Sequence, residues 1–500
     1  MEVLSVIADV LTPAHLLAML AGVVGGLCIG ALPGLTSNLG VALLLPVTFG
    51  MDPISALIML TSLYAAAIYA GSFPAILLHT PGTSASAATA IDGFALTRKG
   101  EFNKAIRIAT FSSVCGGVFS ALMLLVIAPP LSLLSLKFGP PEYFMLAVFG
   151  LTIIGTLASG NMIKGLMSGA AGLAISTVGL DLDSGFPRFA FGSTDLQGGI
   201  GFVPAVIGLF SLSQALLMCE EPHRTIQQVK VTAGGQWRLF PTRDEIRQIR
   251  ATVMRSSLIG GFIGILPGAG GDIGSWAAYN EAKRFSRNDP DFGKGSIRGV
   301  AASESANNAT TGSAMVPLLT LGIPGSPTAA ILLGALIIHG LQPGRTLFTV
   351  HAHFTYTVIV GFLLANLVMG FIGMGLGRYM GVVARLPNSI LIAVVVVLSV
   401  VGAFSLGNNM YDVYTMMAFG LLGYLMRKGN FSPAPMVLGM ILGPMAEQGF
   451  RQSVILADGP VVLHLLGSPI SITLAALSLL SIVSAGYLEF KRTKAARAAG

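Results

Sequence analysis

The sequence predicts an all-α polytopic membrane protein, and three observations lead to this prediction. Of the 500 residues, 53% are hydrophobic and only 10% are charged, whereas soluble domains carry roughly 25% charged residues. Apolar runs long enough to cross a bilayer recur along the whole chain. Four Pro-Gly breaks interrupt the most apolar segments. We therefore expect roughly 10–12 transmembrane helices, some of them broken or re-entrant at the Pro-Gly segments.

The clearest membrane-spanning runs are Phe111–Ala128, Phe144–Ala158, Val358–Met374, Ile390–Phe404 and Pro469–Tyr487. The 63 glycines suit closely packed membrane helices. The net charge of +7 comes from basic residues clustered in loops, where they set orientation, so it does not indicate nucleic-acid binding. Three cysteines, Cys28, Cys115 and Cys219, form no metal or redox motif, and we expect buried structural thiols.

The four breaks form two matched pairs. Leu32-Pro33-Gly34 corresponds to Leu266-Pro267-Gly268, and Thr80-Pro81-Gly82 corresponds to Ile323-Pro324-Gly325. Lipid cannot satisfy the backbone groups that a break leaves unpaired, so breaks persist where protein or a polar cavity surrounds them. Duplicated breaks in two halves of a membrane protein indicate the binding site of a transporter.

Other matches between the halves follow in the same order. Gly26 and Gly30 recur as Gly260 and Gly264, at the same offset along the chain as the first and third breaks. The remaining matches are Gly71-Ser72 with Gly312-Ser313, Gly160-Asn161-Met162 with Gly407-Asn408-Asn409-Met410, and 204–208 with 435–439. Several matches in one order predict an internal duplication.

Basic residues indicate the direction of each half, because Lys and Arg mark cytoplasmic loops. Loop 98–107 is basic, whereas its counterpart 342–351 has one Arg; conversely, loop 49–53 has no basic residue and its counterpart 283–298 has five. Arg427-Lys428 is likewise basic, and its counterpart 181–195 has only Arg188; Lys137 is the one exception on the outer side. The two repeats are therefore predicted to be inverted.

This pattern predicts four parts. Residues 1–219 form an N-terminal membrane repeat, and 256–490 form a C-terminal membrane repeat. The basic linker 220–255 and the tail 491–500 are cytoplasmic.

Small polar residues surround every break. A helix that restarts after Pro-Gly offers free N–H groups to a carboxylate, and a helix that ends there offers carbonyls to Na⁺. The predicted substrate-binding residues are Thr36, Ser37, Asn38, Thr80, Gly82, Thr83, Ser84, Gly268, Gly270, Gly325 and Ser326. The predicted cation-binding residues are Pro33, Asn38, Asp272, Glu304, Asn307, Asn308 and Thr311.

Some of these residues also have simpler interpretations. Asp272 and Glu304 lie inside apolar-flanked segments, where each could coordinate a cation, take up a proton or cap a helix. The glycines spaced four apart between Gly22 and Gly34 suit helix packing as well as ligand approach. Proline in a membrane helix can also simply produce a kink.

The motifs around the breaks resemble the large membrane subunit of tripartite tricarboxylate transporters, the TctA family. They are residues 30–36, 74–83, 264–270 and Glu304-Ser305-Ala306-Asn307-Asn308. The resemblance implies a bacterial inner-membrane importer of carboxylates such as citrate, driven by a cation gradient, commonly Na⁺. It also implies an elevator-type fold and two partners, a periplasmic solute-binding protein and a small membrane subunit.

We therefore expect a binding-protein-dependent secondary transporter for di- or tricarboxylates. A channel or gradient-independent carrier is the main alternative, followed by a purely structural membrane subunit. An enzyme is disfavoured because the sequence has no nucleophile–base signature, paired-histidine zinc motif or Gly-x-Ser-x-Gly. The absence of a phosphate-binding Gly-Lys-Ser/Thr loop argues against ATP-driven transport. We expect no catalytic residues and no cofactor apart from the coupling ion.

Overall fold

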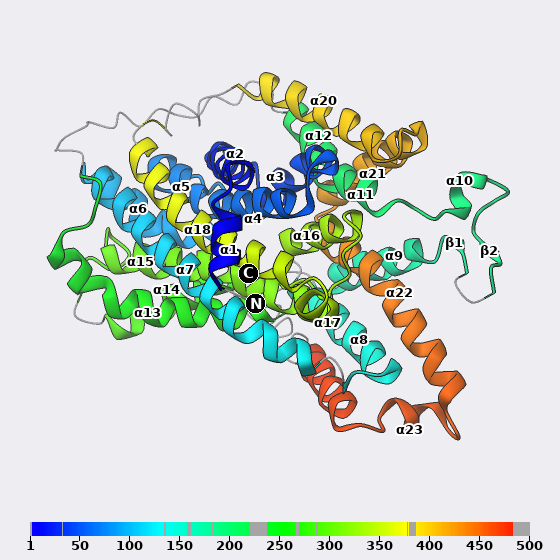
Figure 1. Cartoon of the computed structure of the whole chain (residues 1–500). Helices are drawn as coiled ribbons and strands as arrows, with labels where there is room; N and C mark the ends of the chain where they lie inside the picture. Colours follow the sequence, from blue (N-terminus) through cyan, green and yellow to red (C-terminus); the bar gives the residue numbers. More distant parts are fainter. Residues whose placement is uncertain are drawn as a thin grey trace, which may run out of the picture. The chain divides into compact units, whose positions relative to one another are not determined.

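The computed structural model of the chain is almost entirely helical (Figure 1), which confirms the predicted all-α class. It describes residues 3–32, 34–134, 137–157, 162–181, 184–220, 238–266, 270–286, 289–377, 379 and 387–483. The elements up to residue 220 are α1 (Val3–Val10), α2 (Pro13–Gly30), α3 (Ser37–Leu44), η1 (Pro46–Gly50), α4 (Pro53–Ala70), α5 (Ser72–Leu78), η2 (Ser84–Ser86), α6 (Ala87–Arg98), α7 (Phe102–Leu134), α8 (Pro140–Leu157), α9 (Met162–Ser176), β1 (Gly179–Leu180), β2 (Pro187–Arg188), α10 (Thr194–Gln197), α11 (Phe202–Val206), the π-helix η4 (Ile207–Leu212) and α12 (Ser213–Glu220). The later elements are α13 (Arg243–Ile265), α14 (Gly270–Phe285), α15 (Ile297–Leu321), α16 (Pro327–Ile338), α17 (Arg345–Thr349), α18 (Ala352–Leu376), α20 (Asn388–Gly407), α21 (Met410–Lys428), α22 (Pro433–Leu456) and α23 (Val461–Leu465).

Within these ranges, six helices are long and apolar enough to cross a membrane. They are Pro13–Gly30, Pro53–Leu78, Phe102–Leu133, Phe202–Glu220, Ala352–Leu376 and Asn388–Gly407, with shorter apolar helices at Ser37–Gly50, Ile163–Ser176, Pro327–Ile338 and Pro469–Val483. Three predicted runs thus lie inside α7, α18 and α20. The ends of the runs 144–158 and 469–487 fall outside the described residues. The count of ten to twelve spans stays a prediction.

The chain divides into two compact units. Unit 1 comprises Met1–Pro130 and Gln214–Leu406, and unit 2 comprises Leu131–Ser213 and Gly407–Gly500. Each unit thus takes one segment from each half of the chain. The division predicted at 219 and 256 follows the duplication in the sequence, whereas the compact units cut across it. All four Pro-Gly breaks belong to unit 1.

Glycines bring pairs of helices into close contact in unit 1. A Cβ on Gly22, Gly26 or Gly30 of α2 would lie 2.2, 2.5 or 2.3 Å from a carbonyl oxygen of α4. In the second half, Gly260 and Gly264 of α13 face α15 in the same way. These glycines therefore allow helix packing, while Gly34 (φ 90°) lies in the first break, where glycine adopts the left-handed region without strain.

Unit 2 is built on the same principle. Helix α22 packs on α8 and α9, and a Cβ on Gly172 would lie 2.0 Å from the carbonyl oxygen of Met436. Helix α21 packs against η4, and a Cβ on Gly208 of η4 would lie 2.4 Å from the carbonyl oxygen of Met416. A short antiparallel hairpin, β1–β2, follows α9.

The expectation of three buried cysteines is wrong. Cys28 and Cys219 are exposed, and Cys115 is partly buried. Apolar sequence surroundings did not imply burial here, because the outer surface of a membrane helix is also apolar.

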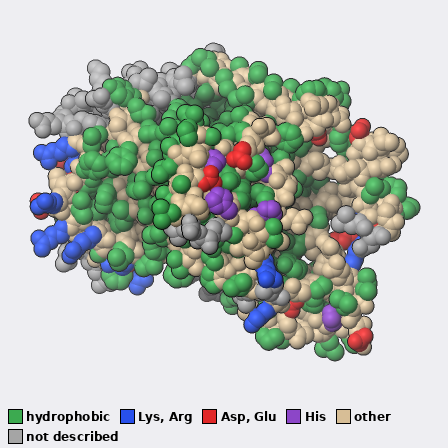
Figure 2. All heavy atoms as spheres, viewed as in Figure 1, with side chains coloured by type: hydrophobic (Ala, Val, Ile, Leu, Met, Phe, Trp, Pro, Cys, Tyr) green, Lys and Arg blue, Asp and Glu red, His purple; other side chains and the backbone are tan. Residues whose placement is uncertain are grey.

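Unit 1 has two ends of different chemistry. At one end, His15 at the start of α2 lies 3.4 Å from Asp52, which caps α4, and His353 at the start of α18 lies 2.9 Å from Asp9. We call this the His–Asp end. In Figure 2, one group of His and acidic side chains lies near the centre of the face, and the largest group of Lys and Arg side chains lies at the left edge.

The basic end of unit 1 lies around the starts of α13 and α15. Arg107 forms a two-point ion pair with Glu245 in the first turn of α13, at 2.5 and 3.2 Å. Lys99 pairs with Asp291, ahead of α15, at 2.9 Å. Helix α18 connects the ends, because it begins at the His–Asp end and Gly377 after its last turn packs beside Ile106. Helices α2 and α4 thus start at the end opposite to their counterparts α13 and α15.

Candidate functional site

The first and third breaks are each followed by a new helix. Thr36 caps α3, where its Oγ1 accepts a hydrogen bond from the N–H of Leu39 at 3.4 Å. Gly270 starts α14 with a φ of 54° and places Asp272 in the first turn. Asn38 and Asp272 are related by the same offset as these two breaks, so they hold corresponding places in the two halves. The first N–H groups of an α-helix have no carbonyl partner within the helix, so both starts offer donors at these breaks.

The second and fourth breaks share one backbone geometry. The N–H of Gly82 donates to the carbonyl of Gly71 at 3.2 Å, and the N–H of Gly325 donates to the carbonyl of Ala314 at 3.2 Å. One offset along the chain relates the two donors and the two acceptors. Gly71 therefore corresponds to Ala314 in the structure. The match between the two halves in the sequence had paired Gly71 with Gly312, two residues earlier.

The helices before these two breaks also end alike. Helix α5 ends at His79 with φ 54°, and α15 ends at Gly322 with φ 72°, both in the left-handed region. The N–H group of the following residue then donates a hydrogen bond to the carbonyl of a proline six residues earlier. These bonds run from Thr80 to Pro74 and from Ile323 to Pro317.

The first break meets the fourth through three polar side chains. Ser37 Oγ lies 3.0 Å from Thr328 Oγ1, and the Thr328 hydroxyl donates to Asn38 Oδ1. Beside them, the hydroxyl of Tyr64 on α4 bonds to Ser326 Oγ at 3.0 Å. Ser326 also caps α16 by accepting from the N–H of Ala329. Polar groups of this half of the site are thus bonded to one another.

The second break meets the third through Asp272. Ser84 Oγ lies 2.8 Å from both carboxylate oxygens of Asp272. The neighbouring Gly271 lies so close to Asn307 that an added Cβ would be 2.3 Å from its Oδ1. Asn307 is fully buried, and neither atom of its side-chain amide has a hydrogen-bond partner among the described residues. This half of the site therefore holds a carboxylate and an unpaired amide.

Two further contacts close a ring of the four breaks. A Cβ on Gly82 would lie 2.6 Å from the carbonyl oxygen of Gly30 at the end of α2. A Cβ on Gly325 would lie 2.4 Å from the carbonyl oxygen of Gly264 near the end of α13. Gly270 in turn faces Ser326. The segments predicted to converge do therefore come together within unit 1.

The predicted residues nearest to this ring are those on the break segments. They are Thr36, Ser37, Asn38, Thr80, Gly82, Thr83, Ser84, Gly270, Asp272, Gly325 and Ser326, joined by Asn307 from α15. Thr80 and Thr83 bond within their own segment, to the carbonyl of Leu78 and to Ser86. Pro33 and Gly268 lie outside the described residues.

The other predicted cation ligands lie on a different stripe of α15. Glu304 accepts hydrogen bonds from Thr89 of α6 at 2.5 Å and Ser113 of α7 at 2.9 Å. Asn308 donates to the carbonyl of Ala65 on α4 at 3.4 Å, and Thr311 donates to the carbonyl of Asn308. Glu304, Asn308 and Thr311 follow helical spacing of four and three residues, so they share one face. That face meets α4, α6 and α7, whereas Asn307 meets α14.

Four partner residues were missing from the predicted set. Tyr64 and Thr328 bond within the ring, and Thr89 and Ser113 bond to Glu304. The offset between the second and fourth breaks places Tyr64 opposite Asn307, so the duplication could have identified Tyr64. No comparable signal in one sequence marks Thr89 or Ser113.

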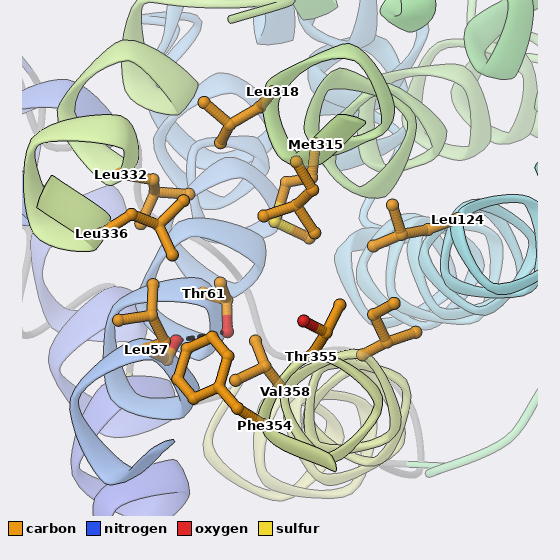
Figure 3. Close-up of a pocket in the computed structure, with 12 residues that line it drawn as sticks. Leu57, Thr61, Leu124, Met315, Leu318, Leu332, Leu336, Phe354, Thr355 and Val358 are labelled. Atoms are coloured by element: carbon orange, nitrogen blue, oxygen red, sulfur yellow. Dashed lines mark hydrogen bonds between the residues drawn. The ribbon is translucent and has the colours of Figure 1, made fainter. Parts of the chain in front are cut away.

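An apolar pocket in unit 1 lies between α4, α7, α15, α16 and α18 and is drawn in Figure 3. Leu124, Met315, Leu332 and Val358 are among the side chains that line it. The hydroxyl of its Thr61 donates to the backbone carbonyl of Leu57 at 2.7 Å. With no charged residue in its lining, this pocket does not suit a carboxylate.

The ring has the chemistry that an anion and a cation require together. The starts of α3, α14 and α16 meet there, and each helix start favours negative charge. Its described segments contain no Lys or Arg, so helix starts, hydroxyls and a co-bound cation would have to balance a carboxylate. Within the described residues, no group of three His, Cys, Asp or Glu side chains is placed to hold a metal ion.

Residues 16–438 match the Tripartite tricarboxylate transporter TctA family. The chain is 36% identical over 476 residues to an uncharacterized 52.8 kDa protein in the TAR-I ttuC' 3' region of Agrobacterium vitis, covering 95% of this chain and 94% of that relative. It is 34% identical over 226 residues to an uncharacterized protein in the TAR-II ttuC' 3' region of the same organism, covering 45% of this chain and 93% of that relative.

No solved structure matches the chain. The family match covers most of the sequence and includes all four breaks, so the chain belongs to the TctA family of tripartite tricarboxylate transporters.

Proposed function

We propose that this chain is the large permease subunit of a secondary transporter that imports di- or tricarboxylates together with a cation. The cation that we propose is Na⁺. The observation that carries the proposal is the ring of four breaks, in which three helix starts meet the Asp272 carboxylate and the unpaired amide of Asn307. Helix starts suit the carboxylates of the substrate, and Asp272 suits the cation.

The two ligands are assigned to overlapping parts of the ring. The substrate-binding residues are Ser37, Asn38 and Ser326 near Tyr64, with Thr36, Thr80, Gly82, Thr83, Ser84, Gly268, Gly270 and Gly325 completing the set. The first cation position is formed by Asp272 and Asn307. Glu304, with Asn308 and Thr311, is proposed as a second cation or proton position, because its carboxylate is fully buried and its described hydrogen bonds come from hydroxyl groups.

The two halves of the chain are proposed to be inverted repeats of an elevator-type transporter. The opposite starting ends of α2 and α4 compared with α13 and α15 support inversion. The presence of all four breaks in unit 1 supports its role as the moving transport domain, with unit 2 as the scaffold.

We place the protein in the bacterial inner membrane, with linker 220–255 and the C-terminal tail in the cytoplasm. Its partners would be a small membrane subunit and a periplasmic solute-binding protein, as the tripartite family implies. The basic end of unit 1 would then face the cytoplasm, and the His–Asp end would face outward.

Uptake by proteoliposomes tests this function. The chain is reconstituted with its small membrane subunit, the binding protein is added outside, and uptake of radiolabelled citrate and succinate is followed. An inward Na⁺ gradient should drive accumulation above equilibrium. Asp272→Asn should lower the rate at least tenfold, because it removes the negative charge from the proposed cation position. Asp291→Asn, which alters an exposed ion pair at the basic end, should transport normally.

Each alternative gives a different result. Equal uptake with and without the Na⁺ gradient rejects Na⁺ coupling, and a proton gradient is then applied. Uptake that stops at equilibrium under both gradients indicates a channel or gradient-independent carrier. Normal accumulation by Asp272→Asn moves the cation position away from the ring.

A further inference from the structure

Unit 2 carries a projecting hairpin whose surface is aromatic. Strands β1 and β2 and helix α10 extend away from α9 and α22 (Figure 1). Around the second strand, Phe186, Phe189 and Phe191 are 68%, 60% and 88% exposed. We call these three side chains the aromatic tip. Phenylalanine has no polar atom to place in water, so three exposed rings close together in sequence are unfavourable unless something covers them.

The base of the hairpin is held rigidly. Asp181 is buried, and Arg451 of α22 bonds to both of its carboxylate oxygens, at 3.1 and 2.7 Å. Arg188 forms a two-point pair with Glu447 of α22, at 2.5 and 3.2 Å, and Arg451 also contacts Glu447 at 2.7 Å. Ser184 adds two hydrogen bonds to Asp181. This network fixes the orientation of the hairpin on α22.

The backbone of the tip is strained. Phe189 and Phe191 have φ values of 51° and 47°, in the left-handed region that bulky residues rarely adopt. Strain of this kind persists where it serves a function. Here it turns two apolar rings outward from a rigid base.

Two helices place the hairpin at the outer end of unit 2. Lys164 near the start of α9 donates to the carbonyl of Gly429, directly after the basic pair Arg427-Lys428 that marks the cytoplasmic side. Helix α9 then rises about 22 Å before the hairpin. Helix α22 starts at Pro433 near the same basic pair and reaches Glu447 after about 21 Å. The hairpin thus lies at the far ends of α9 and α22, about 21–22 Å from the end predicted to be cytoplasmic.

The charge of the segment favours a protein over a lipid surface as the covering partner. Residues 177–201 contain three Asp and one Arg. Arg188 and Asp181 are both paired at the hairpin base, so Asp195 is the exposed charged side chain among the described residues of this segment. Segments that lie on membranes are rich in Lys and Arg, and the aromatic belt at a membrane surface is formed by Trp and Tyr. An acidic segment with exposed phenylalanines instead matches an apolar pocket with a basic rim.

We propose that the aromatic tip is the docking site for the soluble solute-binding protein, which would receive the rings in an apolar pocket bordered by Lys or Arg. The inference rests on the proposed function for the identity of this partner. Buried aromatic side chains dominate the binding energy of protein interfaces, so Phe189 and Phe191 should carry most of the affinity. The acidic Asp195, also exposed, should contribute mainly to the association rate.

Phe189→Asn/Phe191→Asn tests the proposal, because asparagine tolerates the left-handed backbone. The full chain and its small subunit are placed in nanodiscs, and binding of the purified binding protein of the same system is measured with and without carboxylate. The double variant should weaken binding at least tenfold. In proteoliposomes it should raise the concentration of binding protein needed for half-maximal uptake, with the maximal rate unchanged. Asp195→Lys should slow association and reduce its dependence on salt.

Val462→Asn/Leu463→Asn is the matched control. These residues of α23 are 66% and 69% exposed, and α23 follows the outer end of α22. The control should bind the partner within twofold of wild type. Unchanged affinity of the Phe189/Phe191 variant overturns the docking site. The docking site is equally overturned if that variant changes only stability in nanodiscs, which would indicate a lipid contact. Failure of the wild-type complex to transport refutes the proposed function instead, while binding alone still tests the hairpin.

Discussion

At the scale of single residues, Asn307 combines complete burial with a side-chain amide that is unpaired among the described residues. A buried polar group without a partner destabilises a protein by about 1–3 kcal/mol. Its Oδ1 faces Gly271, next to the Asp272 carboxylate, and any side chain at position 271 would displace it. An amide oxygen beside a carboxylate is a suitable ligand for Na⁺. We infer that the amide is kept unpaired for a transported ion.

Asn307→Ala should therefore separate stability from ion binding. In KCl, the variant should unfold at a temperature close to that of wild type, because the lost volume is offset by removal of an unpaired amide. If Na⁺ binds as proposed, NaCl should stabilise wild type by about 2.7 kcal/mol at 100 times Kd. The half-effective Na⁺ concentration of the variant should rise at least tenfold. Thermal unfolding in NaCl and KCl at equal ionic strength measures both quantities.

Asn308→Ala is the comparison for this experiment. Asn308 is equally buried and its Oδ1 also lacks a partner among the described residues, but its amide nitrogen donates to the carbonyl of Ala65. Its replacement should lower the unfolding temperature in both salts and change the Na⁺ response less. If Asn308→Ala abolishes the Na⁺ response and Asn307→Ala does not, the stabilising Na⁺ binds at the second proposed position around Glu304, and the position assigned to Asp272 and Asn307 is wrong.

The sequence predicted these residues as a class but not their directions. Two adjacent asparagines in an apolar helix must differ in direction by about 100°, so one sequence cannot tell which of them faces the break. The answer depends on Gly271, which lets α14 approach α15 closely. Similarly, Thr328 and Asn38 are 290 positions apart, and only folding reveals their contact.

At the scale of elements, a single carboxylate fixes the start of α15. Asp92 of α6 is fully buried, and its Oδ1 accepts hydrogen bonds from the N–H groups of Gly293, Gly295 and Ser296, each at 2.8 Å. Its Oδ2 accepts from the Tyr279 hydroxyl at 2.9 Å. Ser296 caps α15, so this arrangement attaches the helix bearing Asn307 to α6.

Asp92→Asn should destabilise the protein with little change in substrate specificity. Hydrogen bonds to a charged acceptor are roughly twice as strong as neutral ones. The four bonds to Asp92 would weaken together, and the loss should amount to about 2–4 kcal/mol. Unfolding of the detergent-solubilised protein, followed by temperature, measures this loss. Asp291 lies in the loop ahead of α15 to which Asp92 bonds, and its side chain is exposed, so Asp291→Asn should have little effect on stability. An equal loss of stability in both variants would show that Asp92 has no special role.

The positions of the breaks were readable from sequence because proline lacks an N–H and glycine tolerates unusual backbone angles. Their detailed geometry was not. In the second break, the left-handed residue that ends α5 is His79, three residues ahead of Gly82, while its counterpart Gly322 is a glycine. A histidine gives no local signal for that conformation. The constant offset between the second and fourth breaks, which aligns His79 with Gly322, supplies the missing information.

At the scale of the whole molecule, the duplication predicted from sequence is accompanied by matching contacts in unit 1. Gly30 meets Ala67 as Gly264 meets Thr310, and Gly82 meets Gly30 as Gly325 meets Gly264. A fold assembled from two equivalent halves can exchange their roles at similar free energy, which is the basis of alternating access. The predicted repeat boundaries did not reveal the two compact units, because each unit takes a segment from each repeat.

Alternating access makes a prediction about Ser84, which is exposed and bonded to Asp272. Ser84→Cys is introduced after Cys28, Cys115 and Cys219 are replaced by alanine. A membrane-impermeant maleimide is then added to right-side-out and inside-out vesicles, with Na⁺ alone or with Na⁺ and citrate. Reactivity at position 84 should move from one side to the other as the ligands change, because under alternating access the site would open to each side in turn. Thr194→Cys on the outer hairpin and Lys104→Cys at the basic end should each react from one fixed side.

Labelling of Ser84→Cys from the same side at the same rate in every condition would argue against alternating access. Simultaneous labelling from both sides would favour a continuous pore.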